Sequence, residues 1–249
     1  MTMTGPTARP IRFTADLAAW RGIVETLGGV LVHEAQGWLV YQLGSGRLAL
    51  HAGGGDDGER PGTTTLCVET PEPLERAVRG VRDAGVPMEV AETNHGRAGE
   101  LRAADGTLVT LDTETPVDAG SAPGGATEPR LAVLPIWYGP DVSLPRDVLE
   151  ALGARPEIVG DDGTWTELVF PGGGRAGVHR AESPGVQLAF WWDGDVEDAL
   201  ALLTDAGVEA VLIDETYSRT VQFADPDGGE RIWINERQTD LYGYTRAGG

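Results

Sequence analysis

Two stretches of this chain carry the same pattern, and this internal repeat restricts the fold more than any other feature of the sequence. Residues 74–112 align with residues 196–234, and an Asp-Ala-Gly-Val and a later Asp-Gly recur at a constant offset of 122 residues. A second match joins the hexapeptides GRLALH and GRAGVH, residues 46–51 and 174–179. Chance matches would not keep this register, so the chain is a tandem duplication.

The last copy of the repeat predicts the order of its elements. An apolar strand over 186–192 precedes a helix over 195–206, whose leucines recur at helical spacing and whose end is marked by Gly207. Three short strands follow, and the turn Asp-Pro-Asp-Gly at 225–228 joins the last two. The order is therefore βαβββ, and four such units account for most of the chain. Residues 1–9 are expected to form a frayed tail.

The βαβββ order, with the D-P-D-G turn before its final strand, resembles the vicinal oxygen chelate superfamily. This group contains glyoxalases, bleomycin-resistance proteins and extradiol dioxygenases. The resemblance implies an α+β fold in which two units pair into one eight-stranded cup, with the helices outside and a ligand cavity inside. We therefore expect two tandem domains, residues 8–116 and 130–240, joined by the polar linker 117–129.

Composition excludes several functions. The formal charge of −20 argues against nucleic acid and against an anionic membrane surface. No lysine occurs, which excludes Schiff-base chemistry and P-loop phosphate binding. The single cysteine and an N-terminal stretch with no apolar core, unlike a secretory signal, predict a cytoplasmic protein. We expect a monomer or homodimer that binds a small molecule.

Strand alternation predicts which side chains point into the two cups. A loop residue, Tyr217, is a candidate contact above the second cup. The first cup is expected to present Trp38, Gln42, Arg47, His51 and Cys67. The second is expected to present Trp165, Glu167, Arg175, His179, Gln187, Trp191 and Trp233.

The resemblance also bears on cofactors. Metal-dependent members of the superfamily hold a divalent ion with His, Gln and Glu from the first and last strands of paired units. In the first half, Thr65 and Thr110 occupy two of those places. In the second half, His179 and Gln187 remain, but Trp233 replaces the closing Glu. The sequence therefore predicts no cofactor, with one divalent metal in the second domain as the alternative.

Two functional hypotheses follow. The first is a metal-independent protein that binds and sequesters an antibiotic or secondary metabolite, because the inward tryptophans suit an apolar or aromatic ligand. The second is an enzyme, either metal-dependent and glyoxalase- or dioxygenase-like, or a metal-free lyase, isomerase or cyclase. His179 or Glu167 would then act as the acid–base group. A further possibility is that one half has no pocket, and the first half is the expected candidate.

Overall fold

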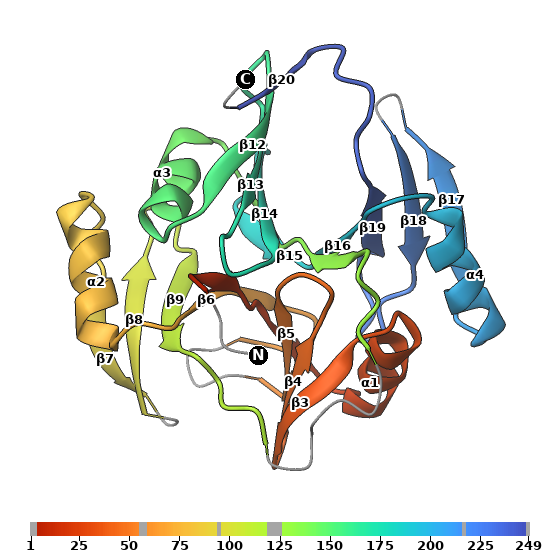
Figure 1. The fold of residues 1–249 in the computed structure, drawn as a ribbon, viewed down its shortest axis with the longest axis horizontal. Helices are drawn as coiled ribbons and strands as arrows, with labels where there is room; N and C mark the ends of the chain where they lie inside the picture. The colour runs from red at the N-terminus through yellow and green to blue at the C-terminus, as the bar shows by residue number, and fades with distance from the viewer. Residues whose placement is uncertain (1–3, 55–58, 94–95, 119–125, 216–217, 248–249) are drawn as a thin grey trace.

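The structure is a computed structural model that describes residues 4–54, 59–93, 96–118, 126–215 and 218–247 (Figure 1). The α+β fold is confirmed: four βαβββ units follow one another along the chain. The helices are α1 (Leu17–Thr26), α2 (Leu74–Asp83), α3 (Ser143–Ala151) and α4 (Glu197–Asp205). Among the described residues, none of the helices has the length and apolar character needed to cross a membrane.

The first half builds one curved sheet. Its strand order is β3-β4-β5-β2-β6-β9-β8-β7, and β1 pairs with β6 outside this path. Within each unit the first and last strands are parallel, so β2 lies beside β5 and β6 beside β9. The strands are β1 (Thr7–Ala8), β2 (Ile11–Thr14), β3 (Val30–Ala35), β4 (Trp38–Gln42), β5 (Arg47–Ala52), β6 (Thr64–Thr70), β7 (Glu89–Thr93), β8 (Gly96–Arg102) and β9 (Leu108–Thr113).

Local sequence accounts for the limits of the helices. The side chain of Asp16 accepts a hydrogen bond from the amide of Ala19 at 2.9 Å, which caps the start of α1. Trp20 and Val24 lie on the buried face of that helix. The helix ends before Gly28, whose φ of +85° suits glycine far better than any other residue.

The second half differs from the prediction in the continuity of two strands. The predicted strand before α3 is split near Pro135, and the predicted strand before α4 is split at Leu188. Pro135 has no N–H to donate to a continuous ladder, which is one reason for the first break. The pieces pair in two separate sheets, β10-β16-β19-β18-β17 and β15-β11-β14-β13-β12-β20.

Apart from these two breaks, the strands of the second half lie close to their predicted positions. The C-terminal strand β20 pairs with the edge of β12. The strands are β10 (Leu131–Val133), β11 (Ile136–Gly139), β12 (Arg155–Gly160), β13 (Trp165–Val169), β14 (Arg175–Arg180), β15 (Gly185–Gln187), β16 (Ala189–Trp192), β17 (Ala210–Asp214), β18 (Arg219–Phe223), β19 (Ile232–Glu236) and β20 (Tyr244–Arg246).

The predicted frayed tail is wrong for the described residues closest to the first unit. Strand β1 pairs antiparallel with β6, and the amide of Ala8 donates to the carbonyl of Gly173 at 3.0 Å. Arg9 is only 1% exposed, although it was assigned to the tail. The segment is ordered because it has backbone partners in both halves of the chain.

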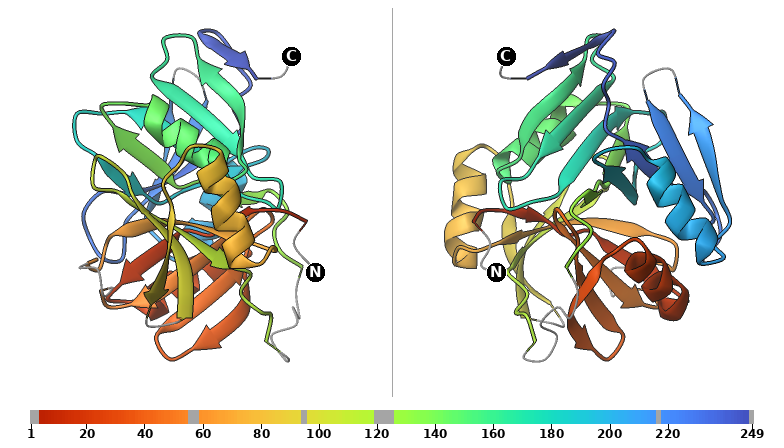
Figure 2. Two further views of the ribbon diagram at one scale, coloured as in Figure 1. Left: turned by 90° about the vertical axis from the view of Figure 1, so that its left-hand side faces the viewer. Right: turned by 45° about the vertical axis from the view of Figure 1, so that its right-hand side comes forward.

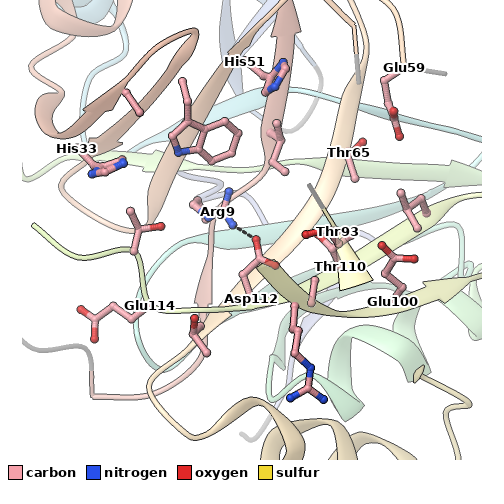
Figure 3. Close-up of a pocket in the computed structure, with 18 of the residues that line it drawn as sticks. Arg9, His33, His51, Glu59, Thr65, Thr93, Glu100, Thr110, Asp112 and Glu114 are labelled. Carbon is pink, nitrogen blue, oxygen red and sulfur yellow. Dashed lines mark hydrogen bonds and ion pairs between the residues drawn. The ribbon is translucent and has the colours of Figure 1, made fainter. Parts of the chain in front are cut away.

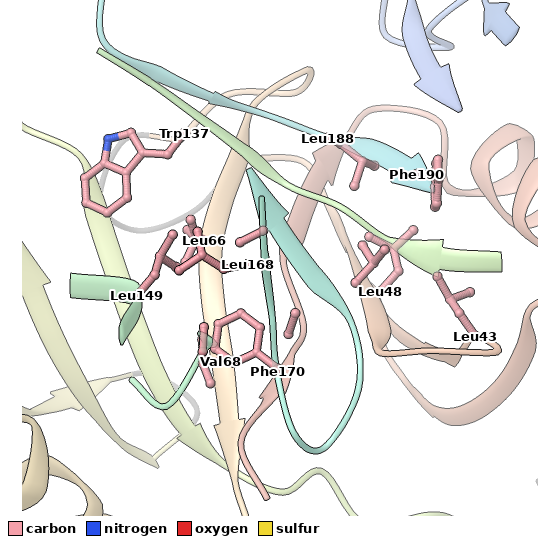
Figure 4. Close-up of a cluster of buried hydrophobic side chains, with 14 of the residues drawn as sticks. Leu43, Leu48, Leu66, Val68, Trp137, Leu149, Leu168, Phe170, Leu188 and Phe190 are labelled. Carbon is pink, nitrogen blue, oxygen red and sulfur yellow. The ribbon is translucent and has the colours of Figure 1, made fainter. Parts of the chain in front are cut away.

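One apolar core joins the two halves (Figure 4). It includes Leu66 and Val68 of β6 together with Leu168 and Phe170 from the region of β13. Two glycines that correspond in the repeat, Gly46 and Gly174, meet at this contact. Glycine is required at position 46 because a Cβ there would lie only 2.7 Å from the Cα of Gly174. The proposed division into domains 8–116 and 130–240 therefore stays a prediction about boundaries, while the packing between the halves is continuous.

The D-P-D-G turn fastens the second half to the first. Asp227 accepts hydrogen bonds from the Thr14 hydroxyl at 3.0 Å, the amide of Ala15 at 2.7 Å and the indole of Trp20 at 3.1 Å. Its neighbour Asp225 forms an ion pair with Arg12. Figure 1 and the right-hand view of Figure 2 show α1 beside α4 on this side of the molecule.

We expect Asp227→Ala to lower the free energy of unfolding by about 3 kcal/mol, because it leaves several partly buried donors without an acceptor. Urea denaturation followed by circular dichroism measures the change. Asp105 is the repeat counterpart and accepts one such bond, from the indole of Trp137 at 2.9 Å. Asp105→Ala should therefore cost less, about 1 kcal/mol. Equal losses in the two variants would contradict this account.

Candidate functional site

The larger cavity lies in the first half, on the inner face of its curved sheet. Its volume is about 770 Å³. A smaller pocket of about 220 Å³ lies in the second half. This corrects the expectation that the first half would be the one without a pocket. The residues around the larger cavity include Arg9, Phe13, His33, Trp38, His51, Thr65, Glu100, Thr110 and Asp112 (Figure 3).

One wall of this cavity contains a histidine that lies between two aromatic rings. The ring centroid of His51 lies 5.3 Å from that of Phe13 and 5.8 Å from that of Trp38. Strand pairing fixes this arrangement, because Trp38 on β4 stands directly opposite His51 on β5. The Nδ1 atom of His51 is buried and has no hydrogen-bond partner among the described residues. The imidazole therefore has capacity for a further polar partner.

The base of the cavity is an arginine in a cluster of acceptors. Arg9 lies 2.9 Å from Glu69 and forms a second ion pair with Asp112. It also donates to the sulfur of Cys67 at 3.1 Å, and its guanidinium carbon lies 5.3 Å from the ring centroid of Trp38. Arg9 is thus a paired cation whose position is fixed by four neighbours.

Arg47 and Gln42 belong to the support of the cavity. Arg47 lies 2.8 Å from Glu69, which is fully buried, and donates to the carbonyl of Thr115 at 3.0 Å. Gln42 accepts a hydrogen bond from Arg47 at 3.1 Å. Because Thr115 also lines the cavity, this network fixes the chain segment that follows β9 at the cavity wall.

Cys67 lies behind the cavity wall and is 1% exposed. Burial raises the pKa of its thiol, and the neighbouring Arg9 offsets only part of that effect. Its sulfur lies 3.4 Å from a carboxylate oxygen of Asp112. A buried, protonated thiol is a poor nucleophile, so Cys67 contributes packing and a hydrogen bond.

The pocket of the second half brings together three predicted residues. The guanidinium carbon of Arg175 lies 3.8 Å from the ring centroid of Trp191, and Arg175 forms an ion pair with Glu167. Burial raises the pKa of Glu167, and Arg175 opposes that shift. Arg175, Trp191 and Glu167 thus line the pocket of the second half as one stacked and ion-paired group.

The other predicted residues of the second half lie elsewhere. His179 is exposed and lies between Tyr138 and Trp165, at 5.6 and 5.9 Å between ring centroids. Gln187 donates to Glu230, and Trp233 packs in a small apolar cluster. Tyr217 lies outside the described residues. Neither His179 nor Gln187 lines the pocket of the second half.

Sequence reasoning missed several residues of the first cavity, among them Arg9, Phe13, His33, Glu100 and Asp112. The alternation that placed Cys67 inward also applies to the parallel neighbour strand, where Asp112 follows Thr110 by two residues. That signal was present for Asp112. Arg9 had no comparable signal, because its burial depends on pairing between the chain start and β6.

Comparison with known proteins identifies the fold. No protein-family model matches this sequence, and no curated protein matches it. Among solved structures, a catechol 2,3-dioxygenase superposes with a TM-score of 0.62 at 16% identity, covering 93% of this chain and 87% of that chain. The 2,3-dioxygenase LapB from Pseudomonas sp. KL28 gives 0.60 at 14% identity, with 97% and 95% covered. Homoprotocatechuate 2,3-dioxygenase from Brevibacterium fuscum, in complex with 3,4-dihydroxyphenylacetate, gives 0.59 at 17%, with 99% and 82% covered.

These neighbours correct the prediction of no cofactor. The chain shares its fold with dioxygenases. This fold therefore favours the alternative stated above, one divalent metal, over the absence of a cofactor. The described donor set does not fit such an ion. Within the part of the chain that the structure describes, no group of three or more His, Cys, Asp and Glu side chains is placed to hold one.

We expect Cys67, the single cysteine, to react slowly with Ellman's reagent in the native protein at pH 8. Burial and a raised pKa keep the thiol protonated, so reaction must await local opening. Absorbance at the thionitrobenzoate band should show a rate more than about 100-fold higher after unfolding in urea. A rapid, stoichiometric reaction of the native protein would contradict this description.

The order of the βαβββ units and the pairing of their strands agree with the fold of the structural neighbours. This chain has the vicinal oxygen chelate fold of the extradiol dioxygenases.

Proposed function

We propose that this protein is an enzyme that acts on a small organic molecule in the cavity of its first half. The observation that carries the proposal is His51, which lies between two aromatic rings on the cavity wall with Nδ1 unpartnered among the described residues. Imidazole is the side chain best suited to accept and donate protons near neutral pH. A volume of about 770 Å³ suits a metabolite-sized substrate.

The aromatic rings supply the binding surface for such a substrate. Phe13 and Trp38 both line the cavity and hold the imidazole from two sides. An aromatic substrate packed against them would lie next to His51, which would then hold or move one of its protons. The likeness to enzymes that act on catechols supports this class of substrate and supports the enzyme over a passive binder.

A second candidate is a protein that binds its ligand without turnover. The observation that favours it is the mutual pairing of the other polar groups. Arg9, Asp112 and Cys67 contact one another at the base of the cavity. In that case His51 would only form a hydrogen bond to the ligand. A measurement of turnover distinguishes the enzyme from the binding protein.

We expect His51→Ala to lower kcat by about 100-fold or more, because it removes the proton-transfer group while leaving the aromatic walls in place. Catechol, 3,4-dihydroxyphenylacetate and a mixed metabolite extract serve as substrates, and mass spectrometry measures protein-dependent conversion. The Kd of the converted compound should change by less than about fivefold, since the rings provide most of the contact area.

The matched control is His179→Ala in the second half. His179 also lies between two aromatic rings, those of Tyr138 and Trp165, but does not line either cavity. This variant should keep wild-type turnover. Turnover that survives His51→Ala would refute the assigned role. Binding in the first cavity with no conversion of any compound would establish the second candidate.

A further inference from the structure

The first-half cavity carries an excess of negative charge. Five carboxylates and two guanidinium groups line it. Both guanidinium groups already form ion pairs, Arg9 with Glu69 and Asp112, and Arg97 with Glu75 and Glu92; the Nη1 atom of Arg9 is buried without a hydrogen-bond partner among the described residues. An added anion at Arg9 would therefore lie against Asp112. The electrostatics of the cavity oppose an anionic substrate and favour a cationic one.

Two carboxylates in this cavity, Glu59 and Glu100, form no ion pair with a cation among the described residues. Glu100 lies on β8 directly opposite Thr110 on β9 and is half-buried. The carboxylate of Glu100 forms no hydrogen bond or ion pair with any side chain that the structure describes, while its backbone pairs within the sheet. The Oγ1 atom of Thr110 is buried beside the Cys67 thiol, its neighbour across the strand pair. Figure 3 shows Glu100 and Thr110 on the side of the cavity away from His51.

An unpaired carboxylate in a partly desolvated site has a cost, and a cation from outside would offset it. A ligand in this cavity would meet two different environments. Phe13 and Trp38 offer aromatic surface beside His51, whereas Glu100 offers a charged acceptor on the other side. This combination is complementary to a molecule with an aromatic body and a positively charged arm.

We propose that the substrate carries a basic nitrogen, an ammonium or guanidinium group, which binds to the carboxylate of Glu100. Thr110 lies beside this subsite and supplies a hydroxyl group to the same nitrogen. The inference rests on the proposed function in that it uses the same cavity, but it concerns the charge of the substrate and not the role of His51. The formal charge of −20 on the chain adds attraction for a cation at long range.

Three compounds with one catechol ring test the proposal. Catechol is neutral, 3,4-dihydroxyphenylacetate has an anionic arm, and 2-(3,4-dihydroxyphenyl)ethylamine has a cationic arm. Isothermal titration calorimetry measures the three Kd values. We expect the amine to bind at least about tenfold more tightly than the acetate at low salt. The difference should shrink at about 0.5 M salt, because screening weakens partly exposed ion pairs.

Glu100→Gln isolates the carboxylate. Its Kd for the amine should rise about tenfold, while its Kd for neutral catechol stays within about twofold. Glu209→Gln is the matched control. Glu209 is exposed in the second half, and its substitution removes the same single charge. Circular dichroism and thermal unfolding confirm that both variants keep the fold.

Each outcome has a defined meaning. Equal Kd values for the amine and the acetate, or an amine Kd that is unchanged in Glu100→Gln, would overturn the charge assignment and leave the role of His51 intact. Turnover that survives His51→Ala would overturn the proposed function and leave the amine preference intact. Failure of all three compounds to bind would overturn the proposal of an aromatic, cationic substrate.

Discussion

A single buried carboxylate, Glu69, holds the first-half cavity in shape. It lies 2.9 Å from Arg9 and 2.8 Å from Arg47, and the amide of Thr115 donates to it at 3.2 Å. These contacts tie the start of the chain, β5, β6 and the segment after β9 to one point. Removing one partner of a buried ion pair leaves the others uncompensated, so the network persists or fails as a unit.

The duplication placed the same arrangement in both halves, and the halves then diverged. In each, a tryptophan stands opposite a histidine across a strand pair, Trp38 with His51 and Trp165 with His179. The distances between the ring centroids are nearly equal, 5.8 and 5.9 Å. Trp38 and His51 line the larger cavity, whereas Trp165 and His179 line neither this cavity nor the smaller pocket.

The structure also separates fold from chemistry. The solved structures that this chain resembles are dioxygenases, yet identities of 14–17% carry over the arrangement of strands and not the side chains inside the cup. In the first half those side chains are an imidazole, aromatic rings, hydroxyls and carboxylates. This set is suited to binding an organic molecule and moving protons, and its negative charge selects among ligands.

The sequence by itself determined the four repeated units, the positions of the helices and most strands, and the inward direction of Trp38 and His51. These features depend on local spacing and alternation, and the repeat shows the same local pattern at two places in the chain. Only the tertiary structure decided which half holds the larger cavity, that Arg9 is buried, and that two strands break near Pro135 and Leu188. Those features follow from contacts between residues far apart in the chain, and no local pattern encodes how such surfaces fill space.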